Sequence, residues 1–498
     1  MSVRDSGRPM FGRRSARAER RIAVIGAGPA GIAAGRELLR QGFTGLTIID
    51  AQDGPGGTWR LHTYPGLACD VWAHSYTFTY APNPDWSANY APQPEILAYL
   101  ERCAAEFGLT PHLLLDTRVV AARLQDDLTW RLCTDRGEEL TFDVVINAMG
   151  NQHTPVYPDV PGLDSFTGTS FHGTRWDHDV DLRGKRVAVV GSAASAVQIV
   201  PEVAKQAAHL TVLQRSPNWI APRRLKTFTD AQRRRWRRFP VLISAIRRVQ
   251  SLALGQVEHA VTIGHPRMGQ FEKMVTSQLD KTIDDPELRA ALTPDTRFGC
   301  KRGLVSDDFY PTLNQDHVEL IPSGLEQVTP TGLVTADGRE VDVDVIIYCT
   351  GYRILDFDRI EVTGEDGRSL ADDMARAPQA HKGIAVPGFP NYFLAVGPNG
   401  VVLNVSYFWS VEQNVATIVR LLGDLSDLGC TAMSPRPELC ERYNESLSDK
   451  FSAFSWGASD CHSYYRTASG HAPFLFPGNF KQWRGIQSEI TLAEFELT

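Results

Sequence analysis

Residues 166–196 read FTGTSFHGTRWDHDVDLRGKRVAVVGSAASA and decide how the rest of the chain is interpreted. In its first half, five residues follow the spacing F-x-G-x-x-x-H-x-x-x-W-[P/D]: Phe166, Gly168, His172, Trp176 and Asp177. The second half joins an apolar run, RVAVV, to a glycine and several small residues that open a helical pattern. An apolar strand that leads through a glycine turn into a helix is typical of a dinucleotide-binding fold.

The glycine turn of this stretch carries five expected cofactor contacts: Gly191, Ser192, Ala193, Ser195 and Ala196. Ala193 and Ala196 occupy the second and third glycine positions of the G-x-G-x-x-G pattern. Because the second glycine normally lets a pyrophosphate approach the backbone, we expect Ala193 to keep the phosphates slightly farther away.

The next strand of this unit, HLTVLQ at 209–214, is followed by Arg215 and Ser216. An acidic residue at this place accepts from the ribose hydroxyls of NAD, whereas an arginine suits the 2′-phosphate of NADP. We therefore predict that Arg215 and Ser216 contact NADP. The alternative for Arg215 is an ordinary surface arginine.

A second glycine turn lies near the start of the chain, where IAVI leads into Gly26-Ala-Gly-Pro-Ala-Gly31 and a later strand, LTIID, ends at Asp50. Gly26 permits the tight turn, Gly28 lets a pyrophosphate approach, and Gly31 lets helix and strand pack closely. The helix N-terminus offers free N–H groups to the phosphates. The predicted contacts of this cofactor are Gly26, Gly28, Ala30, Gly31 and Asp50.

The two units share the same order of elements. A β-meander from Arg118 ends in DVVINAMG at Gly150, and a second meander ends in DVIIYCTG at Gly351. The repeat predicts an α/β fold with two tandem Rossmann-like domains, one inserted in the other. The expected boundaries are 21–155 with 387–498 for the first domain, 156–386 for the second, and about 223–295 for a helical insertion.

The expected insertion is rich in helix formers and carries RRRWRR at 233–238. Such insertions often shape a substrate entrance. The basic run is interpreted as a solvated helix face in preference to an anion or membrane site.

The five-position spacing at 166–177 resembles the fingerprint of the type I Baeyer–Villiger monooxygenases, flavin enzymes that convert ketones into esters or lactones. Further segments agree with that family in order: GGTW at 56–59, YPGLACD at 64–70, GCKRG at 299–303 and GPN at 397–399. The resemblance covers roughly residues 20–490 and implies FAD and NADPH as cofactors. It also implies that cofactor contacts come from Gly57, Thr58, Trp59, Asp70, Tyr76, Val119 and Asn399.

The Lys301-Arg302 pair matches the family's K-R segment. The resemblance implies that Lys301 assists NADP binding and that Arg302 faces the flavin as a permanent cation, with Asp70 holding it in position. These two, Arg302 and Asp70, are the expected catalytic residues. The chain departs from the family at Tyr464, where a tryptophan is common.

The resemblance implies that NADPH reduces FAD, that O2 adds to the reduced flavin as a C4a-peroxide, and that this peroxide attacks a ketone substrate. Three alternatives stay open: a flavin N- or S-hydroxylating monooxygenase, a flavin reductase or electron-transfer protein without oxygenation, and a non-catalytic NADP-sensing protein. A disulfide reductase would need a redox cysteine pair near the flavin, and the cysteine spacings indicate none.

The composition of the chain argues against several other classes of function and partner. The net charge of −7 argues against nucleic acid as the main partner. Eight cysteines without a C-x-x-C pair indicate neither a zinc site nor a disulfide framework, which favours a reducing cytoplasm. No apolar run approaches the ~20 residues of a membrane span. The basic residues 1–20 are expected to form a mobile arm, and the oligomeric state is left open.

Overall fold

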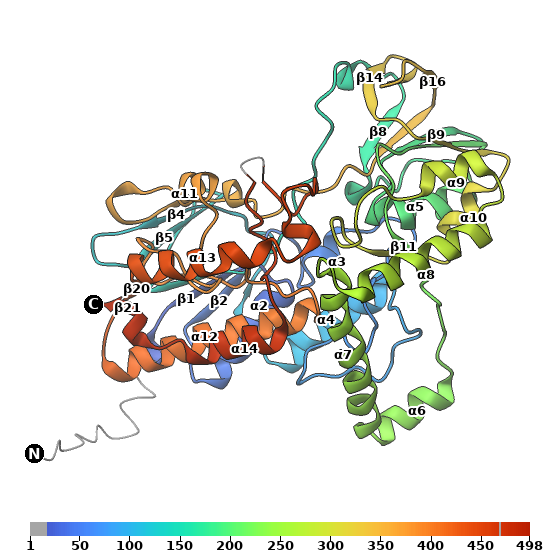
Figure 1. Cartoon of the computed structure of the whole chain (residues 1–498). Coiled ribbons are helices and arrows are strands. Elements are labelled where there is room, and N and C mark those ends of the chain that lie inside the picture. The colour runs from blue at the N-terminus through green and yellow to red at the C-terminus, as the bar shows by residue number, and fades with distance from the viewer. Residues whose placement is uncertain (1–16, 468–469) are drawn as a thin grey trace, which may run out of the picture.

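The structure is a computed structural model that describes residues 17–467 and 470–498 of the 498-residue chain. Two parallel five-stranded sheets organise these residues, one on each side of the molecule in Figure 1. The first sheet has the order β19-β7-β1-β2-β3. Its strands are β1 (Ile22–Ile25), β2 (Leu46–Ile49), β3 (Leu113–Leu114), β7 (Val144–Asn147) and β19 (Tyr392–Leu394).

The second sheet repeats this design with the order β13-β10-β9-β17-β8. Its strands are β8 (Thr169–His172), β9 (Arg186–Val190), β10 (His209–Leu213), β13 (Val318–Ile321) and β17 (Val345–Tyr348). Residues 166–196 therefore supply both an edge strand, β8, and a central strand, β9. The two sheets confirm the predicted α/β class with two Rossmann-like units.

Alternate residues of the central strands face two different cores. In β1, Ile22 and Val24 join the core that contains α2, α4 and α12, whereas Ala23 and Ile25 pack against an antiparallel sheet on the other face. This is why IAVI is apolar throughout: a parallel sheet is covered on both faces. The helices of this first unit are α2 (Pro29–Arg40), α3 (Thr58–Leu61), α4 (Gln93–Glu106), α11 (Leu370–Arg376), α12 (Tyr407–Leu428), α13 (Pro437–Phe451) and α14 (Phe480–Glu489).

The predicted meanders form the outer layers. The first comprises β4 (Val119–Leu124), β5 (Trp130–Thr134) and β6 (Glu139–Phe142), with β18 (Glu361–Thr363) parallel to β4. The second comprises β14 (Leu325–Thr329), β15 (Gly332–Thr335) and β16 (Glu340–Asp342). It covers one face of the second sheet, and α5 (Ala194–Ala204) and α10 (Phe309–Leu313) cover the other.

Four helices occupy the segment where the insertion was predicted: α6 (Asp230–Arg238), α7 (Val241–Val261), α8 (Pro266–Thr282) and α9 (Pro286–Leu292). A short parallel pair, β11 (Ile220–Ala221) and β12 (Leu304–Val305), closes the segment at its base. Figure 1 shows α6 and the start of α7 projecting from the body of the molecule.

The sequence pattern predicts a helix from about Ser406 to Leu422. The helix is longer in the structure, where α12 ends at Leu428 and Gly429 caps it in the left-handed conformation. Gly423 lies inside the helix and is buried. A Cβ on Gly423 would lie 3.2 Å from the Arg17 guanidinium, a contact that a small shift of the arginine side chain could relieve. A single glycine lowers helix propensity by about 1 kcal/mol relative to alanine, so it does not by itself end a helix.

The expectation of a mobile arm over residues 1–20 is wrong for its last residues, while residues 1–16 lie outside the described part of the chain. Arg17 forms an ion pair with Asp427 at 2.9 Å, and Arg20 donates to the Thr431 carbonyl at 3.0 Å. The guanidinium groups therefore attach this segment to the end of α12, which the composition of the segment could not show.

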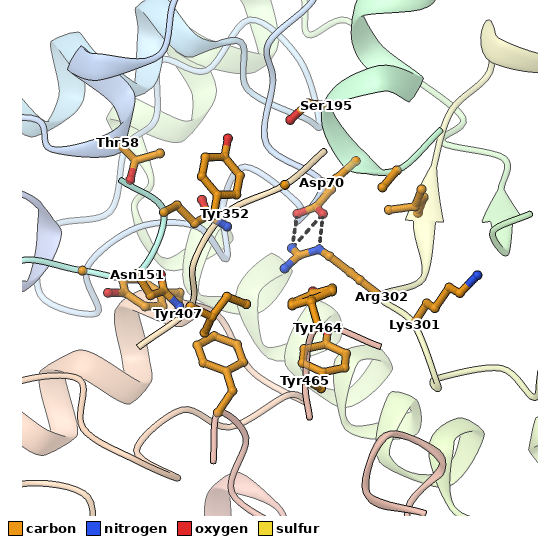
Figure 2. Close-up of a pocket in the computed structure, with 18 of the residues that line it drawn as sticks. Thr58, Asp70, Asn151, Ser195, Lys301, Arg302, Tyr352, Tyr407, Tyr464 and Tyr465 are labelled. Atoms are coloured by element: carbon orange, nitrogen blue, oxygen red, sulfur yellow. Dashed lines mark hydrogen bonds and ion pairs between the residues drawn. The ribbon is translucent and has the colours of Figure 1, made fainter. Parts of the chain in front are cut away.

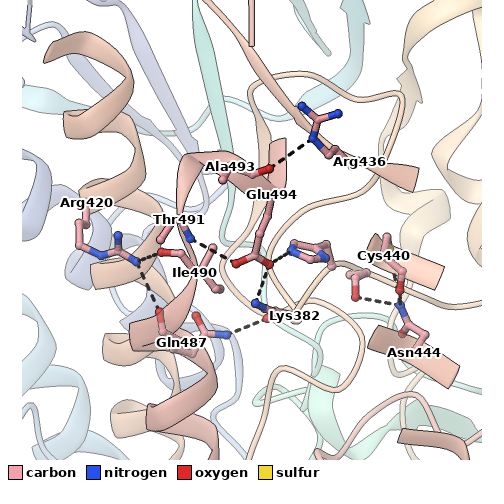
Figure 3. A network of polar contacts seen from close by, with 12 residues as sticks. Lys382, Arg420, Arg436, Cys440, Asn444, Gln487, Ile490, Thr491, Ala493 and Glu494 are labelled. Carbon is pink, nitrogen blue, oxygen red and sulfur yellow. Dashed lines mark hydrogen bonds and ion pairs between the residues drawn. The ribbon is translucent and has the colours of Figure 1, made fainter. Parts of the chain in front are cut away.

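The carboxyl end of the chain is held by a polar network around Glu494 (Figure 3). Its carboxylate accepts from Lys382 Nζ at 2.6 Å and from His381 Nε2 at 2.9 Å. Next to it, β20 (Met433–Pro435) and β21 (Phe495–Leu497) pair antiparallel. In the described part of the chain, no helix is both long and apolar enough to cross a membrane.

Candidate active site

A cavity of about 1840 Å³ lies between the two sheets. Both glycine turns line it, together with the segments that follow the carboxyl ends of β7 and β17. Ligands of open parallel sheets bind at the carboxyl ends of the strands, because the strand order reverses there and leaves a crevice. Among the described residues, two nucleotide-binding crevices thus open into the same cavity.

The first glycine turn leaves room for a ligand at one position only. A Cβ on Gly26, whose φ is +107°, would lie 2.7 Å from the Ala148 carbonyl oxygen, and a Cβ on Gly31 would lie 1.8 Å from the Gly26 carbonyl oxygen. Gly28 differs, since its nearest protein atom would be Gly57 Cα at 3.4 Å. Gly26 and Gly31 therefore serve chain packing, and the open side of Gly28 fits a pyrophosphate at the N-terminus of α2.

Asp50 lies at the end of β2 and faces the cavity. Its carboxylate accepts from the Ala27 N–H at 2.6 Å and from the Gln52 N–H at 2.9 Å. Burial raises the pKa of Asp50, although these hydrogen bonds oppose the shift. Each carboxylate oxygen can accept further bonds, so the geometry fits a ribose diol.

The GGTW segment meets the first glycine turn directly. A Cβ on Gly57, whose φ is +56°, would lie 2.8 Å from Gly28 Cα, and Thr58 follows on the cavity wall. Trp59 donates through its indole N–H to the Tyr76 hydroxyl at 3.1 Å. These residues, together with Val119 and Ala30, line the cavity beside the first turn.

The second glycine turn repeats this arrangement. A Cβ on Gly191, whose φ is +112°, would lie 2.5 Å from the Cys349 carbonyl oxygen. Ala193 directly precedes α5 and is exposed, and Ser192 and Ser195 line the cavity next to it. The open N-terminus of α5 therefore fits a second pyrophosphate.

A positively charged corner lies where β10 ends. Lys301 donates from Nζ to the Ser216 hydroxyl at 2.6 Å and to the Pro217 carbonyl at 3.2 Å. Burial lowers the pKa of Lys301, and the nearby Arg215 lowers it further. Arg215 itself is exposed on the cavity wall. Arg215 and Lys301 thus lie where this type of fold receives the 2′-position of the ribose. Two positive charges there suit a 2′-phosphate.

Arg302 and Asp70 form a two-pronged ion pair inside the cavity (Figure 2). Nε and Nη2 of Arg302 donate to the two carboxylate oxygens of Asp70, both at 2.8 Å. The charge of Asp70 raises the pKa of Arg302 well above its ordinary value. Arg302 nevertheless keeps 38% of its side chain exposed, so part of the guanidinium remains free to meet a ligand.

Tyr464 and Tyr465 lie on the other side of Arg302, with their ring centroids 4.3 Å apart (Figure 2). Burial raises the pKa of Tyr464, so this hydroxyl stays protonated at neutral pH. Tyr464 still exposes 48% of its surface, and it lines the cavity where the family commonly has a tryptophan.

Three predicted positions do not line the cavity: Gly31, Ala196 and Asn399. Ala196 is fully buried inside the second unit. The Asn399 side-chain amide donates to the carbonyls of Ala472 at 2.9 Å and Leu475 at 2.7 Å. Asn399 thus holds the carboxy-terminal segment over the cavity and does not face it.

Several residues of the cavity wall were not predicted from the sequence, among them Tyr352, Asn151, His62 and Tyr64. Tyr352 and Asn151 directly follow Gly351 and Gly150, which lie three residues beyond the ends of β17 and β7. The rule that ligands bind at the carboxyl ends of parallel strands could therefore have identified both residues. Tyr352 stacks on His62 with centroids 5.4 Å apart. Burial lowers the pKa of His62 to about 3, which keeps its imidazole neutral at physiological pH.

One disulfide joins Cys300 to Cys461, 161 positions apart, which corrects the expectation of no disulfide. The two cysteines are far apart in the sequence and belong to no local motif, so the sequence did not predict their pairing. Both cysteines are buried and neither lines the cavity, so the disulfide links the K-R segment to the carboxy-terminal segment and offers no redox pair to a cofactor.

Comparison with known proteins agrees with this geometry. The model of the flavin-binding monooxygenase-like family matches residues 19–363. Proteins named Baeyer–Villiger monooxygenase from Streptomyces coelicolor and Pseudomonas aeruginosa are 39% and 37% identical to the chain. The matches cover 96% of this chain in both cases, and 92% and 91% of the relatives. The chain belongs to the Baeyer–Villiger monooxygenases of this family.

Solved structures of Baeyer–Villiger enzymes share the whole fold. A structure of OTEMO in complex with FAD and NADP gives a TM-score of 0.86 at 27% identity. An oxidized steroid monooxygenase bound to NADP gives 0.85 at 29% identity. Each match covers 96% of this chain and 99% of the other. The predicted family and the predicted fold class are thereby confirmed.

Proposed function

We propose that this Baeyer–Villiger monooxygenase binds FAD at the first glycine turn and NADPH at the second, and uses O2 to convert a ketone into an ester or lactone. The observation that carries the proposal is the Arg302–Asp70 pair, which lies in the one cavity that both glycine turns border. A permanent cation between two nucleotide crevices is what this oxygenation requires, since negative charge develops on oxygen.

FAD is assigned to the first unit because Gly28 leaves open backbone at the start of α2 and Asp50 presents a carboxylate for ribose. Thr58, Trp59 and Tyr76 lie along the same wall. When bound, FAD supplies the electrons that activate O2. The protein's part is to hold the cofactor and to exclude water from the reacting centre.

NADPH is assigned to the second unit because Arg215 and Lys301 converge near Ser216. A guanidinium can bind the 2′-phosphate through two parallel hydrogen bonds, and the ammonium of Lys301 adds a point charge. NADH has no phosphate on this ribose, so neither Arg215 nor Lys301 would have an anionic partner in NADH.

Arg302 is the proposed catalytic cation and Asp70 its positioning partner. Asp70 binds Nε and Nη2 of Arg302, so the remaining N–H groups can donate to a ketone oxygen that becomes negative during attack. Arginine keeps its charge in a dry site, where an ammonium group loses its proton more readily. The Tyr464 hydroxyl, protonated at neutral pH, faces the same space as a further donor.

The domain division follows from these assignments. We assign residues 21–155 and 387–498 to the FAD-binding domain and residues 156–386 to the NADP-binding domain, with the helical insertion at about 223–295. The end of the second range is an exception, because β18 (Glu361–Thr363) and α11 (Leu370–Arg376) pack on the first unit and belong with the FAD-binding domain. We place the reaction in the cytoplasm, because six of the eight cysteines, all within the described residues, are free thiols.

The test is NADPH consumption by the FAD-loaded enzyme with cyclic, aromatic and aliphatic ketones, followed by product identification. An ester or lactone that carries one atom from labelled O2 supports the proposal. Amines and sulfides are tested in parallel. Oxidation of those substrates alone, with every ketone unchanged, would instead assign the chain to hydroxylating chemistry.

A further inference from the structure

The α6 helix and the first part of α7 form the most basic segment of an otherwise acidic chain. Residues 231–257 contain seven arginines and no aspartate or glutamate, whereas the whole chain has a net charge of −7. In Figure 1 these helices project from the body of the molecule. The proposed function uses none of these arginines.

The buried face of α6 is defined by Trp236. Its ring packs edge-on against Phe228 at 4.8 Å and His74 at 4.7 Å. Arg234 and Arg238 are two positions away on either side, about 200° around the helix, so they point away from the body. Both are exposed.

The buried face of α7 is defined by Ile243 and Arg247. Arg247 donates to the Thr79 carbonyl at 3.1 Å and lies over the Trp409 ring at 5.3 Å. By the same helical spacing, Val249 and Leu252 face outward. Their exposed fractions are 67% and 66%.

Apolar side chains continue onto the turn between the helices, where Val241 is 71% exposed and Phe239 49%. Arg238 lies over the Phe239 ring at 5.6 Å. We call the outward residues Arg234, Arg238, Phe239, Val241, Val249 and Leu252 the α6–α7 face. Phe239 thus lies next to an arginine, and Val241, Val249 and Leu252 are further large apolar side chains exposed on the same two helices. Surfaces that contact only water rarely expose several large apolar side chains together.

The arginines of this face lack acidic partners. Among ion pairs within residues 17–467 and 470–498, Arg233 binds Asp230 and Arg237 binds Asp85, but none involves Arg234, Arg238 or Arg248. The face therefore presents uncompensated positive charge together with apolar groups.

We propose that the α6–α7 face binds the surface of an anionic lipid bilayer. Phosphate headgroups meet the arginines, while Phe239, Val241, Val249 and Leu252 enter the boundary between headgroups and acyl chains. An acidic protein would satisfy the arginines but gives no reason for four exposed apolar side chains. The sequence alone favoured a solvated face because it did not show that α7 turns Val249 and Leu252 outward.

The face is continuous with the cavity through α7. Further along this helix, Leu254, Val257 and Val261 line the cavity wall. Binding at a bilayer thus places the cavity beside a phase in which apolar molecules concentrate. The binding itself is independent of the proposed function and can be measured without turnover.

The experiment is co-sedimentation of the FAD-loaded full-length protein with phosphatidylcholine vesicles, with or without phosphatidylglycerol. We expect binding to the mixed vesicles only, and weaker binding as salt increases. Arg234→Glu with Arg238→Glu should lower the partition coefficient by about tenfold or more. Phe239→Ser with Leu252→Ser should weaken binding while the salt dependence remains.

Lys481→Glu with Arg484→Glu is the matched control, since it makes the same charge change at exposed positions of α14. We expect this variant to bind like the wild type, and all variants to keep the wild-type rate of NADPH oxidation without vesicles. Equal loss in the control, or no binding to mixed vesicles, would overturn the proposal. So would a wild-type dimer in light scattering that the α6 variant dissociates, because the face would then bind a second copy.

Discussion

The guanidinium of Arg302 binds both carboxylate oxygens of Asp70, a residue 232 positions earlier in the chain. Arg302 follows the disulfide-bonded Cys300, and Asp70 belongs to the segment after α3. The pair thus connects the second nucleotide unit to the first across the cavity. Its planar geometry fixes the direction of the guanidinium as well as its charge.

Replacing Arg302 tests whether this cation takes part in oxygenation. Arg302→Ala should retain FAD and much of its reduction by NADPH, whereas ester formation should fall by ~10²–10³, the usual cost of a lost oxyanion partner. The NADPH still consumed should appear as hydrogen peroxide. Stopped-flow spectra and product analysis provide the measurements.

Two further variants complete the Arg302 test. Arg302→Lys should restore little activity, because a flexible ammonium cannot bind both oxygens of Asp70 in a plane. Arg339→Ala removes an arginine that pairs with Glu319 outside the cavity and should behave like the wild type. Near wild-type ester formation by Arg302→Ala would remove Arg302 from the mechanism.

Cofactor preference should depend on Arg215. Arg215→Ala should weaken NADPH binding by about 1.5–3 kcal/mol, the range for a hydrogen bond to a charged group, and should change NADH binding much less. KM and Kd for both nucleotides are the measurements. Arg183→Ala, at an exposed position of the same unit, is the control. Equal weakening of both nucleotides would show that Arg215 does not read the 2′-phosphate.

The Cys300–Cys461 disulfide should stabilise the segment that places Tyr464 beside Arg302. Cys461→Ser should lower the free energy of unfolding by about 2–5 kcal/mol. Denaturant titrations with and without a reducing agent measure the effect, and Cys133→Ser, which changes a free thiol, serves as control. If reduction leaves the stability of the wild type unchanged, the disulfide has no such role.

Glu494 should contribute stability that is lost in acid. Burial opposes its charge, but hydrogen bonds from His381 and Lys382 prevail and lower its pKa to about 2. Because the folded pKa lies below the unfolded value of roughly 4.3, the contribution is complete above that value and disappears as the pH falls towards 2.

Glu494→Gln should therefore destabilise the protein at neutral pH by about 1.5–3 kcal/mol, and the difference from the wild type should shrink below pH ~4.3. Thermal unfolding across this pH range is the measurement. The exposed Glu496→Gln, two residues along the chain, is the control. A difference that stays constant with pH would contradict the assigned pKa.

The sequence by itself determined the features that depend on a few neighbouring residues. Gly26, Gly31 and Gly191 are required by close backbone contacts within or beside their own units, so the glycine spacing predicted both turns and hence the fold class. The alternating cores of β1 follow from an apolar run that a two-sided sheet must bury. The matched motifs likewise identified Asp70 and Arg302 before any distance was known.

Only the tertiary structure decided which distant segments meet. It joined Cys300 to Cys461, continued α12 through the buried Gly423 to Leu428, and turned Asn399 towards the carboxy-terminal segment. It also left Val249 and Leu252 exposed on α7. These outcomes depend on how whole elements pack, and the free energy of packing is shared among residues far apart in the chain. A local sequence pattern therefore does not identify such distant partners.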